Sequence, residues 1–172
     1  MASQRLFWAL WPTDEIRQHL QSIQQNTVFK GFKTVRSENL HLTLVFLGQV
    51  SDEQKAFIID QANQIQIPAF SVVLDGLSFW KKPGIVCLTA KEHQKAHQQL
   101  VEQLNEQAIE CGIVTEERPY RPHVTLARYA KQAIRFEPPV LHWQVNSFVL
   151  CQSVSSPTGV YYRVLQQWRL KN

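Results

Sequence analysis

Two short segments of the chain combine a histidine and a threonine at the same spacing. His41 precedes Thr43 in HLTLVFLG, and His123 precedes Thr125 in HVTLAR, 82 residues further along. Six histidines and eight threonines in 172 residues give about 0.3 such triplets by chance. A leucine follows the threonine in both copies, so the repetition indicates a shared function.

Both segments are otherwise apolar and have the composition of buried β-strands. Residues i and i+2 of a strand point to the same face, so His41 shares a face with Thr43, and His123 shares one with Thr125. The residues between them point the other way, into a core. The polar faces must therefore meet water, a cleft or a ligand, and two strands lying side by side or across a groove would bring two imidazoles and two hydroxyls together.

Two imidazoles in one cleft suit proton transfer on both sides of a phosphorus atom. Histidine has an ordinary pKa of about 6.5, so one neutral ring can act as a base while one protonated ring acts as an acid. Threonine hydroxyls can donate hydrogen bonds to the nonbridging oxygens. A 2′,3′-cyclic phosphate fits this scheme because its leaving alkoxide needs a proton. The scheme requires no metal and no cofactor.

The elements that must position these residues follow from apolar periodicity and turn signals, which predict about seven strands and three helices. Strands are expected at 70–79 and 144–154, and the second forms a C-terminal hairpin with 160–169. The mixed order of strands and helices predicts an α+β fold with a largely antiparallel sheet. We expect residues 1–172 to form a single domain, in which each half contributes a helix and then an H-x-T-L strand.

Composition sets further limits. The net charge is +4 and the pI is about 9.1, which mildly favours an anionic partner. Three widely spaced cysteines without a CxxC motif argue against a zinc ribbon and suit a reducing compartment. The chain has no apolar stretch long enough to span a membrane. We expect a cytoplasmic monomer.

The motifs and their flanking segments resemble the two-histidine (2H) phosphoesterases, and most closely the bacterial RNA 2′,3′-cyclic phosphodiesterases, formerly called 2′-5′ RNA ligases. The likeness is carried by RLFWAL at 5–10, SENLHLTLVFLG at 37–48 and RPYRPHVTLAR at 118–128. It implies a bilobal, pseudo-symmetric fold with two largely antiparallel sheets, helices packed outside and a central cleft. It also implies hydrolysis of RNA 2′,3′-cyclic phosphate ends to a 2′-phosphate.

The resemblance assigns roles to five residues. It implies that His41 and His123 are the catalytic pair, that Thr43 and Thr125 bind the phosphate, and that Arg128 lies beside it. If the product is a 2′-phosphate, the acid is the histidine beside O3′. We favour His41 as general acid and His123 as general base, although the near symmetry of the motifs does not by itself assign the roles.

Phe46 matches a family aromatic that stacks on the nucleobase, and Phe7 and Tyr120 are further candidates for stacking. Phe46 and Arg128 each lie five residues after a histidine, so strict alternation places them on the opposite face of the strand. To reach a ligand they need a strand that ends, twists or bulges first. Otherwise Phe46 packs in the core and Arg128 forms a surface ion pair.

Other polar residues are weaker candidates. His93 and His97 have a spacing that can bind zinc on a helix, but no third ligand accompanies them, so we expect a solvated or partly buried surface pair. Basic side chains before the two motifs could hold an RNA backbone: Lys30, Lys33, Arg36, Arg118 and Arg121.

Two alternative functions use the same scaffold. A 2′-5′ RNA ligase or esterase acting on tRNA halves would use the same catalytic residues, so the sequence does not separate it from a phosphodiesterase. A non-catalytic RNA-binding module would bind cyclic-phosphate RNA without turnover.

Overall fold

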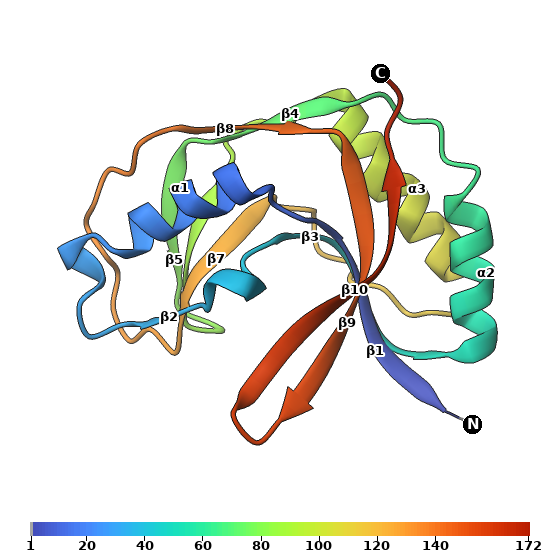
Figure 1. Cartoon of the computed structure of the whole chain (residues 1–172), viewed down its shortest axis with the longest axis horizontal. Helices are drawn as coiled ribbons and strands as arrows, with labels where there is room; N and C mark the ends of the chain where they lie inside the picture. The colour runs from blue at the N-terminus through green and yellow to red at the C-terminus, as the bar shows by residue number, and fades with distance from the viewer. Residues whose placement is uncertain (1) are drawn as a thin grey trace.

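One continuous antiparallel sheet carries both motif strands at its centre (Figure 1). The computed structural model describes residues 2–172. The elements in chain order are β1 (Ser3–Leu10), α1 (Asp14–Gln24), η1 (Thr27–Phe29), β2 (Lys33–Thr34), η2 (Ser37–Asn39), β3 (Leu42–Ser51), α2 (Asp52–Ala62), β4 (Phe70–Leu74), β5 (Gly76–Trp80), β6 (Ile85–Thr89), α3 (Lys95–Glu110), β7 (His123–Arg128), β8 (Leu141–Val145), β9 (Ser147–Ser156) and β10 (Gly159–Arg169). The main sheet has the order β10-β9-β1-β3-β7-β6-β5, with β2 also paired to β7, and β4 and β8 form a second sheet. The α+β class predicted from the sequence is confirmed.

The strand count is higher than the sequence predicted. The segment 70–79 is not one strand, because β4 and β5 separate at Asp75 and join different sheets. The segment 144–154 also divides, at Asn146, into the end of β8 and most of β9. Two short strands that follow one another share a single apolar pattern, so only their partners distinguish them. The C-terminal hairpin of β9 and β10 is confirmed.

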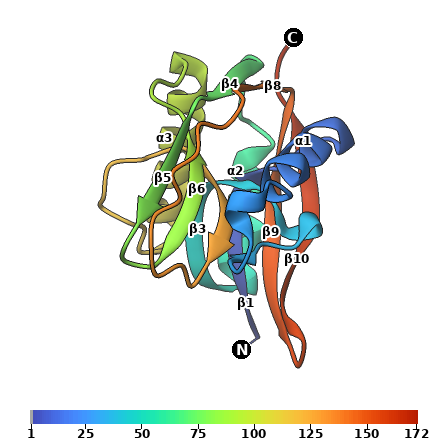
Figure 2. The same cartoon turned by 90° about the vertical axis from the view of Figure 1, so that its left-hand side faces the viewer.

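The main sheet has two halves that meet where β3 pairs with β7. That pairing is antiparallel and consists of Leu42 opposite Val124, both completely buried. Helices α2 and α3 pack against each other and against β3. Helix α1 instead lies beside β7, and Figure 2 shows α1 and α3 on opposite sides of the molecule. The two motif strands are therefore held side by side, with helices outside them.

Each motif strand contains a β-bulge directly after its threonine. The residue skipped directly after the threonine is Leu44 in β3 and Leu126 in β7, and the pairing of β1 with β3 has a second irregularity at Leu47. A bulge inserts one extra residue and changes which face the following side chains meet. Phe46 and Arg128 are therefore returned to the face that carries the histidines and threonines, and both are exposed there. The bulge resolves the conflict between their spacing and strict alternation.

Side chains from outside the motif strands hold both bulged segments. At the end of α1, the Nε2 group of Gln24 donates to the carbonyl of Leu126 at 3.0 Å and to that of Val35 at 2.9 Å. The hydroxyl of Tyr120 donates to the carbonyl of Thr43 at 3.3 Å. The carbonyl of Leu126 also accepts from the backbone N–H of Val35 at 2.8 Å, so Gln24 is a second donor to it beside the bulge.

Replacing Gln24 with Ala is expected to lower the free energy of unfolding by about 1–2 kcal/mol, because the carbonyl groups beside the bulge lose a donor. Urea unfolding measures the change. The neighbouring Gln25 is exposed, and no hydrogen bond of its side chain occurs within residues 2–172. Gln25→Ala is therefore the matched control and should change stability by less than about 0.5 kcal/mol. Equal effects of the two substitutions would show that the Gln24 amide does not stabilise the bulge.

Candidate active site

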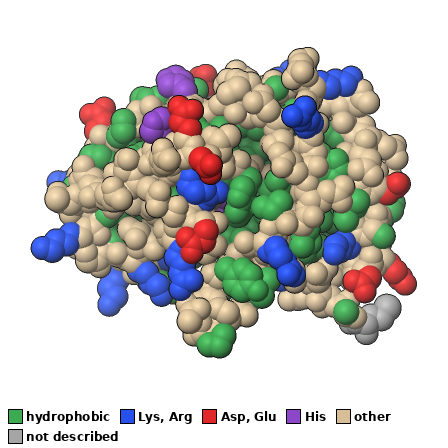
Figure 3. All heavy atoms as spheres, viewed as in Figure 1, with side chains coloured by type: hydrophobic (Ala, Val, Ile, Leu, Met, Phe, Trp, Pro, Cys, Tyr) green, Lys and Arg blue, Asp and Glu red, His purple; other side chains and the backbone are tan. Residues whose placement is uncertain are grey.

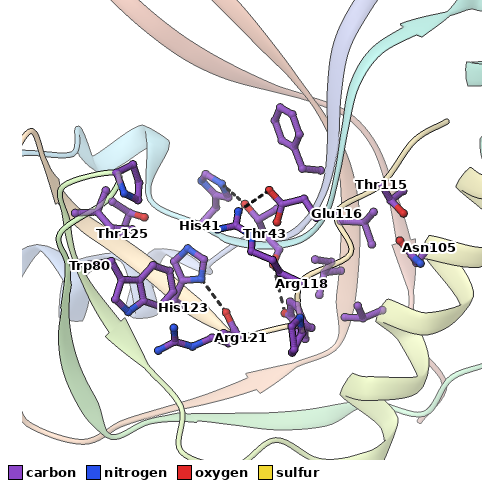
Figure 4. A pocket seen from close by; sticks show the side chains of 18 of the residues that line it. His41, Thr43, Trp80, Asn105, Thr115, Glu116, Arg118, Arg121, His123 and Thr125 are labelled. Carbon is purple, nitrogen blue, oxygen red and sulfur yellow. Dashed lines mark hydrogen bonds and ion pairs between the residues drawn. The ribbon is translucent and has the colours of Figure 1, made fainter.

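Both H-x-T pairs lie on one face at the centre of the sheet. Since β3 and β7 pair at the residue between each histidine and its threonine, His41 is level with Thr125, and Thr43 is level with His123. The histidines are diagonal neighbours, which in a regular antiparallel ladder lie roughly 7–8 Å apart. This arrangement leaves room for one phosphoryl group between two imidazoles. Figure 4 shows the two rings facing the cleft from neighbouring strands.

The four motif side chains line a cleft with a volume of about 1180 Å³. A second pocket of about 550 Å³ adjoins it. The two share six lining residues: Val35, Asn39, His41, Thr43, Phe46 and Arg128. They are therefore branches of one cleft that meet at the motif residues, and we refer to them as the larger branch and the smaller branch.

The orientation and tautomer of His41 are fixed by its hydrogen bonds. Its Nδ1 lies 2.7 Å from the carbonyl oxygen of Asn39, and its Nε2 lies 2.9 Å from the hydroxyl of Thr43. A carbonyl only accepts, so Nδ1 carries the proton and the neutral ring accepts from Thr43 at Nε2. Asn39 is itself buried and bound to β10, since it donates to the carbonyl of Val160 and accepts from the N–H of Tyr162.

His123 is held in the same way. Its Nδ1 donates to the carbonyl of Arg121, two residues earlier, at 2.8 Å. The guanidinium of Arg121 lies 4.5 Å from the ring centroid of Trp80, and that ring lies 4.5 Å from the imidazole. Sequence reasoning missed both Trp80 and Asn39, and the only signal for Asn39 was its position two residues before the histidine.

The environment of His41 holds the ring neutral. Three aromatic rings surround its imidazole, with centroids 4.9–5.8 Å away: Phe7, Trp11 and Tyr162. Burial lowers the pKa of His41 to about 4, and the positive charge of Arg128 contributes in the same direction. Burial is also the main cause that lowers the pKa of His123. Both imidazoles are therefore neutral at pH 7 in the free protein.

The structure places Phe46 and Arg128 at the junction of the two branches. Phe46 is 38% exposed, with the guanidinium of Arg5 4.7 Å from its ring centroid, so it does not pack in the core. Arg128 is exposed and forms no ion pair with any residue in 2–172. Both are available to a ligand, and stacking of a base on Phe46 remains a prediction.

The other two candidates for base stacking, Phe7 and Tyr120, lie in different surroundings from Phe46. Phe7 is only 3% exposed and packs against His41, so burial argues against the prediction that it stacks on a base. Tyr120 lines the larger branch, but its hydroxyl lies 2.8 Å from Nε2 of His97 while donating to the carbonyl of Thr43. Tyr120 therefore supports the first motif strand, β3, through its hydrogen bond to the backbone of Thr43.

His97 is completely buried, which corrects the expectation that it forms a surface pair with His93. Its ring stacks on Phe70 with a centroid distance of 4.9 Å and an interplanar angle of 10°. Burial lowers the pKa of His97 to about 3, so the ring is neutral and donates from Nε2 to Tyr120. Within residues 2–172, no group of three or more His, Cys, Asp or Glu side chains is arranged to hold a metal ion.

Two paired strands that each present a histidine and a threonine to one cleft define a two-histidine phosphoesterase. The family model described as LigT like Phosphoesterase matches the chain twice, at residues 10–87 and 88–162. The chain belongs to the LigT-like phosphoesterase family. Each match contains one motif strand, β3 in the first and β7 in the second, and this repetition supports a bilobal, pseudo-symmetric fold.

Relatives match over nearly the full length. The RNA 2′,3′-cyclic phosphodiesterase of Escherichia coli is 34% identical over 97% of both chains. The crystal structure of E. coli LigT in apo form superposes with a TM-score of 0.91 at 31% identity and covers all of both chains. The complex of E. coli LigT with 3′-AMP gives a TM-score of 0.92 at 32% identity, covering 99% of this chain and 100% of that one.

No helix within residues 2–172 is long and apolar enough to cross a membrane.

The buried histidines predict a pH-dependent stability. Their folded-state pKa values, about 4 for His41 and about 3 for His97, lie below the unfolded value of about 6.5. Between these values the unfolded chain binds more protons than the folded chain. The stability that these two histidines contribute is therefore fully present above about pH 6.5 and falls as the pH decreases toward 4 and then 3. Each histidine contributes a slope of about 1.4 kcal/mol per pH unit within its window.

Urea unfolding at pH 4.5–7 measures that slope. His97→Gln keeps a donor toward Tyr120 but cannot titrate, so its slope should be smaller than that of the wild type by about 1.4 kcal/mol per pH unit. His142→Gln, at an exposed position on β8, is the matched control for the exchange of a histidine for glutamine. An unchanged slope in His97→Gln would contradict the buried neutral state.

Tyr120→Phe removes the hydroxyl that joins His97 to the carbonyl of Thr43. We expect a loss of about 1–3 kcal/mol in the free energy of unfolding, because a buried imidazole N–H is left without an acceptor. Tyr161→Phe is the control, since Tyr161 is 41% exposed. Thermal or urea unfolding of both variants checks the difference, and a Tyr120 variant as stable as the control would refute the supporting role.

Proposed function

We propose that this protein hydrolyses 2′,3′-cyclic phosphate ends of RNA to 2′-phosphate ends with a general acid and a general base, His41 and His123. The observation that carries the proposal is the matched pair of imidazoles in one cleft. Each donates from Nδ1 to the carbonyl two residues earlier, so each uses Nε2 for chemistry. The name of the full-length E. coli relative supports the same substrate class.

In the proposed reaction, a water molecule attacks phosphorus in line with the bond to O3′. Nε2 of His123 takes a proton from the water as its oxygen bonds to phosphorus. In the complex, His41 has first taken a proton from solvent at Nε2, which the negative charge of the bound phosphate favours, and it gives this proton to O3′ as the P–O3′ bond breaks. One water is consumed, and the product carries a 2′-phosphate and a free 3′-hydroxyl.

Thr43, Thr125 and Arg128 are proposed to bind the phosphate. The threonines lie beside the opposite histidine across the strand pair, so their hydroxyls can donate to nonbridging oxygens. The Arg128 side chain faces the same cleft without an acidic partner in the described residues. Its charge would attract the phosphate anion into the cleft, and the negative charge of that anion would favour protonation of the imidazole beside it.

The unequal surroundings of the two rings support the assignment of roles. The nucleophilic water must come from solvent, and the hydrogen bond of the His123 ring is exposed whereas those of His41 are partly buried. We therefore propose His123 as the base that activates water and His41 as the acid beside the leaving oxygen.

His41→Ala and His123→Ala should each lower kcat by about 10²–10⁴-fold on a 2′,3′-cyclic phosphate oligonucleotide, because each removes one proton-transfer group. Product analysis by chromatography also identifies which oxygen leaves and whether a 2′-5′ linkage forms when tRNA halves are supplied. His142→Ala is the control for loss of an exposed histidine. Full activity in either motif variant, both of them folded by circular dichroism, would refute the mechanism.

A sulfur substitution separates the acid from the base. A 2′,3′-cyclic substrate with sulfur in place of O3′ has a thiolate leaving group that needs little protonation. His41→Ala should recover most of its activity on this substrate, whereas His123→Ala should stay impaired. The opposite pattern of recovery would reverse the two roles without affecting the reaction class.

A further inference from the structure

The smaller branch of the cleft is positively charged and contains no acidic side chain. Its lining includes four cationic residues: Arg5, Lys33, Arg36 and Arg128. The larger branch also has four, but three glutamates accompany them: Lys82, Arg118, Arg121 and Arg128, with Glu102, Glu116 and Glu117. The smaller branch is therefore the better place for a chain of phosphates.

Aromatic rings alternate with these cations. Arg5 lies over Phe46, and Nζ of Lys33 lies 5.0 Å from the ring centroid of Tyr129. Tyr129 is 74% exposed, and its φ of 56° makes it the one non-glycine residue with positive φ in the described chain. Such a conformation is uncommon for an aromatic residue, and here it places an exposed ring directly after Arg128. Cations interleaved with exposed rings are typical of surfaces that bind single-stranded nucleic acid.

The branch also has a defined wall. It is bounded by β2 on one side and by the β9–β10 hairpin on the other. Arg36 donates from Nη2 to the carbonyl of Thr158 at 2.7 Å, which fixes its guanidinium against the tip of the hairpin. Figure 3 shows several Lys and Arg side chains along the lower edge of the molecule, where β2 and the hairpin lie in Figure 1.

A 2′,3′-cyclic phosphate terminates an RNA at its 3′ end, so the remaining nucleotides must leave the cleft on the 5′ side. We propose that the smaller branch binds these upstream nucleotides, with Lys33 and Arg36 at backbone phosphates and Tyr129 stacked on a base. This inference rests on the proposed function and specifies its substrate as an RNA strand rather than a free cyclic mononucleotide.

The test compares kcat/KM for 2′,3′-cyclic AMP and for a pentaribonucleotide that ends in the same cyclic adenosine. The double variant Lys33→Gln/Arg36→Gln should lower the ratio of oligonucleotide to mononucleotide kcat/KM by about tenfold at low salt. The slope of log(kcat/KM) against log[salt] for the oligonucleotide should fall by about 1.4, since two phosphate contacts are lost. Tyr129→Gly should also lower the ratio while relieving the positive φ.

The matched control is Lys82→Gln/Arg118→Gln, which removes two exposed charges from the larger branch. A larger loss of the ratio in this control, or a wild-type ratio near one, would overturn the proposed path.

Fluorescence anisotropy of a labelled pentaribonucleotide with a 2′-phosphate end measures binding independently of turnover. Tight binding weakened by Lys33→Gln/Arg36→Gln without any hydrolysis would sustain the subsite and refute the proposed function. If the protein hydrolyses the mononucleotide but both double variants bind the oligonucleotide equally well, the proposed function is upheld and the subsite is refuted.

Discussion

The β-bulge after the threonine of each motif strand is the constraint on which the site depends. In a regular strand, Phe46 and Arg128 would point to the same face as the core leucines. With the bulge, two consecutive residues stay buried in each strand, and the histidine, the threonine and the residue five positions after the histidine face one cleft. The interrupted ladder is compensated by Gln24 and Tyr120, which donate to the carbonyls of Leu126 and Thr43.

These two donors also connect segments that are far apart in the sequence. Gln24 comes from the N-terminal helix and stabilises β7, whereas Tyr120 precedes β7 and stabilises β3. The pairing of Leu42 with Val124 then fixes the register of the four motif side chains. Each motif strand is therefore held by a side chain from another segment of the chain, in addition to the single pairing of Leu42 with Val124.

The pairing of histidine with threonine could be predicted from the sequence because period-two alternation alone decides it. The bulges could not, since a bulge is defined against a partner strand that the sequence does not identify. Asn39 was missed for the same reason, because its buried amide depends on Val160, 121 residues away. His97 followed a helical spacing that suits a surface, but Phe70 and Tyr120 approach from other segments and bury it. Long-range contacts therefore limited the prediction of the site more than local structure did.

The backbone makes the two motifs nearly equivalent, and the surrounding side chains make them different. His41 lies among three aromatic rings. The ring beside His123 is that of Trp80, and the guanidinium of Arg121 lies over Trp80. Burial lowers the pKa of His41, so this ring can act as the acid only when the charge of a bound phosphate favours its protonation. A bound phosphate would favour protonation of either ring, but water reaches the less buried ring more readily. On this physical basis we expect burial, rather than the H-x-T sequence itself, to decide which histidine donates the proton.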